Sequence, residues 1–222
     1  MNTTDITSKL AELASAHHDK IVFSTSFSME DQVITHLILD NKIPIRIFTL
    51  DTGRMFGETY KAMHDTNKRY NQNVQVYFPE TQAVENLVNQ KGLYSFYDSV
   101  ESRKECCFIR KVQPLKRALA GSECWVTGIR AEHSLNRQTM EQWEWDAENN
   151  LYKYHPLLNW SSAEVETFVH KNHIPYNHLH DQNFPSIGCQ PCTRAVLKGE
   201  DIRAGRWWWE DTSKKECGLH GK

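Results

Sequence analysis

The stretch from Lys20 to Asp40, "KIVFSTSFSMEDQVITHLILD", decides the fold. Its first part, "KIVFSTS", is a short apolar run that predicts a buried strand. Its last part, "EDQVITHLILD", has apolar residues at helical spacing, and acids at its start favour the positive end of the helix dipole. A strand that leads through a serine-rich turn into a helix indicates an α/β protein.

The same alternation continues through the first two-thirds of the chain. We expect further helices at about 5–16 and 57–70 and one through "KVQPLKRAL" (111–119), and further strands at 45–50, 74–78 and 123–129. Strands and helices that alternate at this spacing predict a parallel sheet with helices on both faces.

The character of the chain changes at about residue 156. One more helix is expected at 161–173, and three prolines then fall in irregular chain between 175 and 191. The sequence has no internal repeat and no low-complexity linker. We therefore predict a single domain over 1–222, with an α/β part at 1–155 and a loop-rich C-terminal part at 156–222.

The bulk composition excludes several classes of protein. With 222 residues and a net charge of −2, the chain can bury one core and gives no support to nucleic acid or an anionic membrane as partner. The N-terminal segment lacks the apolar core of a targeting signal, and no run of eighteen apolar residues occurs. We expect a cytoplasmic protein whose six cysteines are metal ligands or reactive thiols rather than disulfides.

Four cysteines form a candidate metal centre. Cys189 and Cys192 are a C-x-x-C in the turn "GCQPC", and Cys106 and Cys107 are adjacent in "KECCFIRK". Four thiolates suit a tetrahedral zinc ion or an iron–sulfur cluster. Neighbouring residues on a helix point about 100° apart, which strains two ligands of one ion but suits separate irons. The pattern favours a 4Fe–4S cluster, while zinc, a redox dithiol and, for Cys106 and Cys107, plain core positions remain open.

The other two cysteines call for different interpretations. Cys124 lies beside Trp125 in an apolar strand, so we expect it in the core. Cys217 lies in "KKECGLHGK", where Lys214, Lys215 and His220 would lower its thiol pKa. We predict a catalytic or redox thiol at Cys217, the alternative being an idle surface thiol.

Two loops and several arginines have the chemistry of an oxyanion site. "STSFSMED" (24–31) offers serine hydroxyls and the free N–H groups of a helix start, although it is not a Walker loop and could be a plain cap. "LDTGRMF" (50–56) follows a strand at the edge where open sheets bind ligands. Guanidinium groups suit oxyanions, and we expect about half of the following to meet ligand: Arg130, Arg137, Arg194, Arg203 and Arg206. Trp207, Trp208 and Trp209 are expected to pack.

Seven motifs in this order resemble the adenylyl-sulfate (APS) and phosphoadenylyl-sulfate (PAPS) reductases: "TSFSMED", "FTLDTGR", "CCFIRKVQPL", "WVTGIRAEHSLNR", "GCQPCTRAV", "RAGRWWW" and "KECGLH". The resemblance covers nearly the whole chain. It implies an adenine-nucleotide alpha-hydrolase-like fold, with nucleotide bound by the α/β part and "TSFSMED" as a modified pyrophosphate loop.

The resemblance also assigns roles to residues. It implies that Cys217 is the nucleophile and that Lys111 forms an electrostatic bridge between cluster and substrate. The ligands of the implied 4Fe–4S cluster are Cys106, Cys107, Cys189 and Cys192. The resemblance places Arg203 and Arg206 in the segment that closes with the tail. The residues expected to bind substrate are Ser26, Ser28, Asp51, Thr52, Gly53, Arg54, Lys111, Arg130, Arg137, Arg203, Arg206 and His220.

The function implied is reduction of APS to sulfite and AMP in sulfate assimilation, through an S-sulfocysteine on Cys217. Thioredoxin or a glutaredoxin-like protein would be the electron donor, and homo-oligomerisation is left open. Use of PAPS, alone or with APS, is an alternative. An ATP-dependent thiolation enzyme is disfavoured because the loop lacks paired glycines, and a zinc module for nucleic acid is disfavoured by the net charge.

Overall fold

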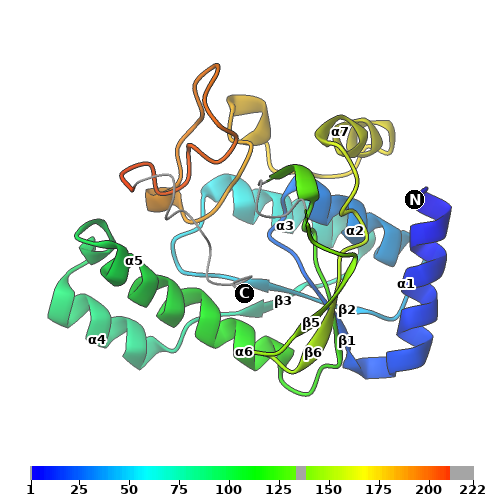
Figure 1. The fold of residues 1–222 in the computed structure, drawn as a ribbon, viewed down its shortest axis with the longest axis horizontal. Coiled ribbons are helices and arrows are strands. Elements are labelled where there is room, and N and C mark those ends of the chain that lie inside the picture. Colours follow the sequence, from blue (N-terminus) through cyan, green and yellow to red (C-terminus); the bar gives the residue numbers. More distant parts are fainter. Residues whose placement is uncertain (1, 134–138, 211–222) are drawn as a thin grey trace. The chain divides into compact units, whose positions relative to one another are not determined.

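The computed structural model describes residues 2–133 and 139–210. Its sheet has six strands in the order β3-β2-β1-β4-β6-β5 (Figure 1). The strands are β1 (Ile21–Ser24), β2 (Arg46–Leu50), β3 (Gln75–Tyr77), β4 (Cys124–Val126), β5 (Trp143–Asp146) and β6 (Leu151–Tyr154).

The central strands are parallel. β1 lies between β2 and β4, with Val22 opposite Arg46 and Ile21 opposite Cys124. β6 runs parallel to β4, and β5 pairs antiparallel with β6 at one edge. The expected parallel sheet is confirmed, whereas the β5–β6 hairpin was not predicted.

Helices connect the strands. The α-helices are α1 (Thr3–His17), α2 (Met29–Asp40), α3 (Gly57–Tyr70), α4 (Thr81–Lys91), α5 (Val100–Cys107), α6 (Gln113–Leu119) and α7 (Ser162–Lys171). A π-helix covers Phe108–Val112, and short 3₁₀ turns cover His18–Lys20, Ser95–Tyr97, Ala131–His133, His180–Gln182 and Gln190–Cys192. Five of the α-helices match predicted ones, whereas α4 and α5 were not predicted.

The chain forms two compact units. Unit 1 comprises residues 1–49, 57–75 and 119–179, and unit 2 comprises residues 50–56, 76–118 and 180–222. The single domain over 1–222 stays a prediction.

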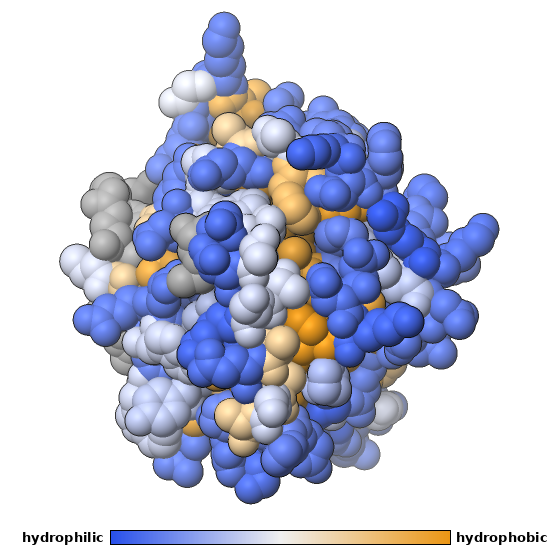
Figure 2. Space-filling model, turned by 90° about the vertical axis from the view of Figure 1, so that its right-hand side faces the viewer, coloured by the Kyte–Doolittle hydropathy of each residue, from blue (hydrophilic) through white to orange (hydrophobic). Residues whose placement is uncertain are grey.

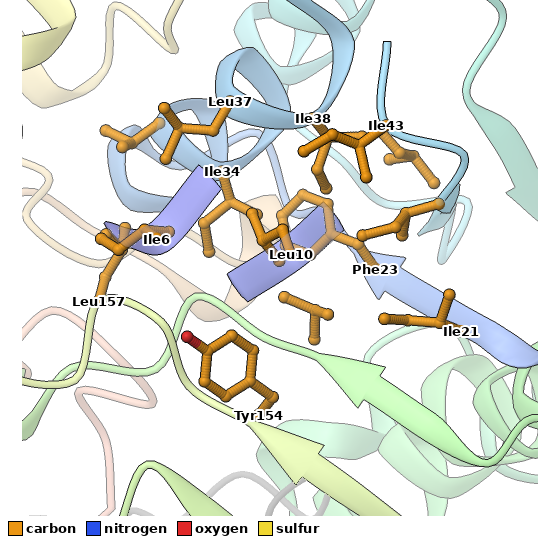
Figure 3. Packing of buried hydrophobic residues seen from close by; sticks show 14 of the residues in the cluster. Ile6, Leu10, Ile21, Phe23, Ile34, Leu37, Ile38, Ile43, Tyr154 and Leu157 are labelled. Carbon is orange, nitrogen blue, oxygen red and sulfur yellow. The ribbon is translucent and has the colours of Figure 1, made fainter. Parts of the chain in front are cut away.

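The core of unit 1 lies where α1 and α2 cover the sheet. Figure 3 shows Leu10 of α1 and Ile34 of α2 beside Phe23 of β1, with Tyr154 of β6 at the border of this cluster. Each fully buried side chain of this size contributes about 1.5–3 kcal/mol by leaving water. Cys124 is fully buried in the same cluster, so its predicted core position is confirmed.

The outer surface contrasts with this core. The face shown in Figure 2 is mostly hydrophilic, with hydrophobic residues visible in a central band and in smaller patches toward its edges. Among the described residues, no helix has both the length and the apolar character needed to cross a membrane.

One buried cluster of unit 2 is rich in sulfur. Its buried members are Leu87, Phe96, Cys106, Cys189, Cys192 and Trp207. Half of these side chains are cysteines that the sequence analysis assigned to a metal centre. The packing of this cluster and its proposed chemistry therefore depend on the same residues.

Candidate active site: a cysteine cavity and an anion-binding loop

Unit 2 contains a small, partly open cavity, which we call the cysteine cavity. It is lined by Arg54, Phe96, Arg103, Cys106, Cys107, Arg110, Lys111, Cys189 and Cys192. These described lining residues include four thiols and four basic side chains but no carboxylate. The structure thus brings together the four cysteines that lie more than eighty residues apart in two pairs.

A change of helix type positions the adjacent cysteines. Cys106 and Cys107 end α5, and the π-helix begins at the next residue. The N–H of Gln113 donates to the carbonyl of Phe108, five residues earlier, so this turn holds one residue more than an α-turn. α5, the π-helix and α6 form one continuous helical segment in Figure 1. The wider turn brings Lys111 to the same cavity as the cysteine pair.

The second cysteine pair is held by a tight turn. The N–H of Cys192 donates to the carbonyl of Cys189 (2.9 Å), across the 3₁₀ turn that contains Pro191. The preceding residue is glycine for a steric reason. A Cβ atom on Gly188 would lie 2.4 Å from Nη2 of Arg206, so a side chain there would displace the guanidinium.

The predicted 51–54 motif lies against the C-x-x-C turn. Oδ1 of Asp51 accepts from the N–H of Gly53 (2.7 Å), which has a φ of +71° that suits glycine. The N–H of Gln190 donates to the carbonyl of Arg54 (2.8 Å). Oγ1 of Thr52 lies 3.2 Å from Sγ of Cys189, within hydrogen-bond range. These contacts place the motif at the cysteine cavity.

Basic side chains surround the thiols. Nη1 of Arg110 donates to the carbonyl of Thr52 (2.7 Å), and the Arg54 guanidinium lies 4.8 Å from the ring centre of Phe96. Burial raises the pKa of the Cys106 thiol, which Arg54 and Arg110 oppose. Burial, with negative charge on Cys189 and Cys107, raises the pKa of Cys192 to about 12. Ionising the Cys106 and Cys192 thiols therefore costs more free energy in this cavity than in water.

The thiols border the cavity without converging on a point. Within the described part of the chain, no group of three or more His, Cys, Asp or Glu side chains is placed to hold one metal ion.

In unit 1, the loop from Ser24 to Ser28 joins β1 to α2. Oδ2 of Asp31 accepts from the N–H of Ser26 (2.6 Å) and from its Oγ (2.7 Å). Phe27 has a φ of +60° and a fully buried ring, which holds this unusual backbone conformation in place. The Ser26 hydroxyl, predicted to bind substrate, therefore also fixes the loop through Asp31.

Asp31 is buried beside the loop that follows β4. Burial, with the charge of Glu30, raises the pKa of Asp31 to about 7, against the hydrogen bonds from Ser26 and Ser28. A Cβ atom on Gly128 would lie 1.9 Å from Oδ1 of Asp31, so the β4 loop approaches as only glycine permits. β1 and β4 are adjacent strands at which the strand order reverses, the place where open α/β sheets bind ligands.

Arg130 is already engaged within unit 1. Its guanidinium is buried and donates to Oε2 of Glu132 (2.7 Å) and to Oγ of Ser162 (3.0 Å). Oε2 of Glu132 also accepts from the N–H of Ser162 (2.6 Å), at the start of α7. Arg130 thus ties the loop after β4 to α7, whatever else it binds.

The C-terminal motif is described as far as Glu210. Nη1 of Arg206 donates to Oγ of Ser186 (3.2 Å), and the N–H of Arg203 donates to Oδ1 of Asp201 (2.8 Å). Trp207 is fully buried, which confirms packing there, whereas Trp208 is 40 % exposed. Cys217, His220 and Arg137 lie outside the described residues.

The sequence analysis missed two arginines of the cavity. Arg103 and Arg110 are both buried and line it. Arg103 precedes Cys106 by three residues on one helix, a spacing that puts two residues on one face and was a usable signal. Arg110 was visible inside "CCFIRK", but its partner Thr52 could not be read from the sequence.

The family model for the phosphoadenosine phosphosulfate reductase domain matches residues 20–195. The chain belongs to this family. Among curated members of the phosphoadenosine phosphosulfate reductase family, the chain is 52 % identical over 202 residues to the adenosine 5'-phosphosulfate reductase of Allochromatium vinosum. That match covers 91 % of this chain and 79 % of the relative.

Solved structures agree with this family assignment. The chain is similar to the PAPS reductase of Candida auris, with a TM-score of 0.71 and 25 % identity, over 86 % of this chain and 90 % of that one. Candida glabrata FMN adenylyltransferase matches with a TM-score of 0.58 at 16 % identity, over 93 % of this chain and 72 % of that one. That second likeness concerns the fold alone, and it agrees with the predicted α/β fold.

Proposed function

We propose that this chain is an adenosine 5'-phosphosulfate reductase, which converts APS to sulfite and AMP in sulfate assimilation. The observation that carries the proposal is the cysteine cavity, where four thiols meet basic side chains within a reductase family fold. Relatives named adenosine 5'-phosphosulfate reductase match at 44–52 % identity.

The chemistry of the residues that line the cavity supports a 4Fe–4S cluster as its ligand. Four thiols line the cavity, and no carboxylate is among its described lining residues. Cys106, Cys189 and Cys192 are buried in one cluster with Phe96 and Trp207. Cys106, Cys107, Cys189 and Cys192 would be its ligands, and Thr52 would hydrogen-bond to a ligand sulfur. When bound, the cluster supplies structural cross-linking and a local electrostatic field.

Basic residues near the thiols serve the anionic substrate. Lys111 borders the cavity, and an ammonium there would lower the energy of a sulfuryl group approached by a thiolate. In unit 1, the N–H groups at the start of α2 offer donors to phosphate oxygens. Ser26 and Ser28 stay proposed substrate residues, although their hydroxyls bond to Asp31 in this structure. The other residues predicted to bind substrate stay proposals. Arg130 and Arg206 would contribute by fixing the loops to which they already donate hydrogen bonds.

The chemical step uses the thiol of Cys217. As a thiolate, its Sγ attacks the sulfur of the sulfuryl group, and the bond from that sulfur to the phosphate oxygen breaks. AMP leaves with the bonding electron pair, and Cys217 is left carrying an S–SO₃⁻ group. No external electron is needed for this half of the reaction.

A dithiol protein completes the cycle. One donor thiolate attacks Sγ of Cys217 and releases sulfite, and the second donor thiol then displaces Cys217 as a thiolate. The donor, thioredoxin or a glutaredoxin-like protein, becomes a disulfide, and two thiol protons are released. A nucleophile in the terminal segment suits a step that must meet first a nucleotide and then a protein.

PAPS is the second candidate substrate, because the chain is also similar to the Candida auris PAPS reductase. The complete set of four cysteines favours APS. Sulfite release with reduced thioredoxin, measured with APS and PAPS side by side and with Cys217→Ser as control, tests the proposal. We expect turnover with APS that Cys217→Ser abolishes; turnover with PAPS alone would reverse the substrate assignment, and none with either would refute the function.

A further inference from the structure

A buried ion pair joins α5 to the last described residue of the chain. Nε and Nη2 of Arg103 donate to Oε1 and Oε2 of Glu210 at 2.9 and 2.7 Å. The two side chains are only 2 % and 3 % exposed. This is a two-pronged contact between a guanidinium and a carboxylate, the geometry that fixes direction as well as distance.

Both partners are tied to the cysteine cavity. Arg103 lines it and lies 4.5 Å from the ring centre of Trp207. The N–H of Trp207 donates to the carbonyl of Cys192 (3.1 Å), and the N–H of Glu210 donates to the carbonyl of Trp207 (2.9 Å). The segment 207–210 is thus held to the cavity wall by backbone bonds at one end and by the ion pair at the other.

Burying this ion pair costs folding free energy, so a gain in stability does not explain why the pair is present. Two charges must leave water, and apolar side chains of similar volume stabilise such positions as well or better. What the pair does provide is a contact of fixed distance and direction. Glu210 of this pair precedes Cys217 by seven residues in the sequence.

We propose that Arg103 and Glu210 are positioning residues that fix the root of the catalytic segment beside the cysteine cavity. This inference rests on the proposed role of Cys217 as nucleophile. Cys217 follows Glu210 by seven residues, a length that spans at most about 25 Å. Fixing Glu210 confines the thiolate to that radius and raises its effective concentration at the substrate.

Two variants test the pair. Glu210→Gln removes the charge with little change of shape, and Arg103→Lys keeps the charge but loses the fork. Lys91→Gln is the matched control. It breaks an exposed ion pair between Lys91, at the end of α4, and Glu105, which lies on α5 like Arg103. Each protein is mixed anaerobically with APS without thiol donor, and formation of the SO₃ adduct is timed by mass spectrometry and normalised to iron content.

We expect adduct formation to slow by about tenfold to 100-fold in Glu210→Gln and by less in Arg103→Lys. APS affinity, measured in a Cys217→Ser background, should stay unchanged. Backbone amides of residues 207–210 should exchange hydrogen faster in both variants than in Lys91→Gln.

Three outcomes would overturn the proposal. Adduct formation at the wild-type rate per iron-loaded molecule would show that the pair does not position the thiol. Loss of iron in step with activity, with an unchanged rate in the loaded fraction, would make the pair merely structural. A wild-type chain that binds APS but forms no adduct would refute the proposed role of Cys217, and this inference with it.

Discussion

Asp31 is buried against the loop that it organises, and burial raises its pKa to about 7. The unfolded chain releases this proton near the ordinary aspartate pKa of 3.8, so between these pH values the native state holds a proton that the unfolded state has lost. The contribution of Asp31 to stability is therefore greatest below pH 4 and is lost as pH rises through 7.

Asp31→Asn removes this titration while keeping the shape of the side chain. Relative to Asp31→Asn, the wild type should lose on the order of 2 kcal/mol of unfolding free energy between pH 5 and pH 8. Urea unfolding of both proteins at the two pH values measures it. Parallel pH profiles would mean that Asp31 is ionised throughout this range.

Gly188 offers a steric test at the same scale. Gly188→Ala would push a methyl group against the Arg206 guanidinium and break its bonds to Ser186 and Ile187. We expect a loss of about 1–3 kcal/mol in unfolding free energy, as for overpacking in general. Gly57→Ala is the control, because a Cβ atom there would meet nothing within 4 Å. Equal effects of the two substitutions would show that Arg206 yields without cost.

At the scale of elements, the π-helix after the adjacent cysteines makes a prediction of its own. Deleting Phe108 would restore an α-turn and rotate α6 by about 100° relative to Cys106 and Cys107. We expect the deletion variant to lose bound iron, measured per chain by elemental analysis.

Phe108→Ala keeps the number of residues and removes only a ring that is 46 % exposed. It should retain iron as the wild type does. Full iron content in the deletion variant would mean that the π-turn does not position the cysteines.

The elements that the sequence predicted well are those with strong periodicity. The strand expected at 45–50 is found at Arg46–Leu50, where most residues are apolar and the middle of the strand is buried. The hairpin of β5 and β6 was missed, although "WEWD" and "LYKY" alternate across a turn where Asn150 has a φ of +54°. α4 and α5 were missed because their apolar residues are few: α4 buries only Leu87.

The residues of the candidate site likewise fall into those that the sequence could predict and those that it could not. The cysteine pairs, Lys111 and the 24–31 loop could be found from local motifs, since residue type and spacing carry that chemistry. The Arg103–Glu210 pair could not, because its partners are 107 positions apart and each resembles an ordinary surface charge. Pairings across such distances are set by the fold.

At the scale of the whole molecule, the two units should differ in their dependence on iron. Unit 1 has a large apolar core of its own, whereas half of the buried cluster in unit 2 is cysteine. Removing iron with a chelator should therefore loosen unit 2 while leaving unit 1 folded. Hydrogen exchange should rise in residues 180–210 and stay low in β1 and β4. Equal loosening of both units would show that the cluster stabilises the fold as a whole.

The most direct test of the central claim is an anaerobic native mass spectrum, recorded before and after addition of APS without a thiol donor. The account predicts a chain that is heavier by a 4Fe–4S cluster and then gains a single SO₃ group, located on Cys217 by fragmentation. A chain that carries the cluster but forms no adduct with APS or PAPS would contradict the reductase mechanism. A chain that carries zinc in place of iron and sulfide would contradict the assignment of the cysteine cavity.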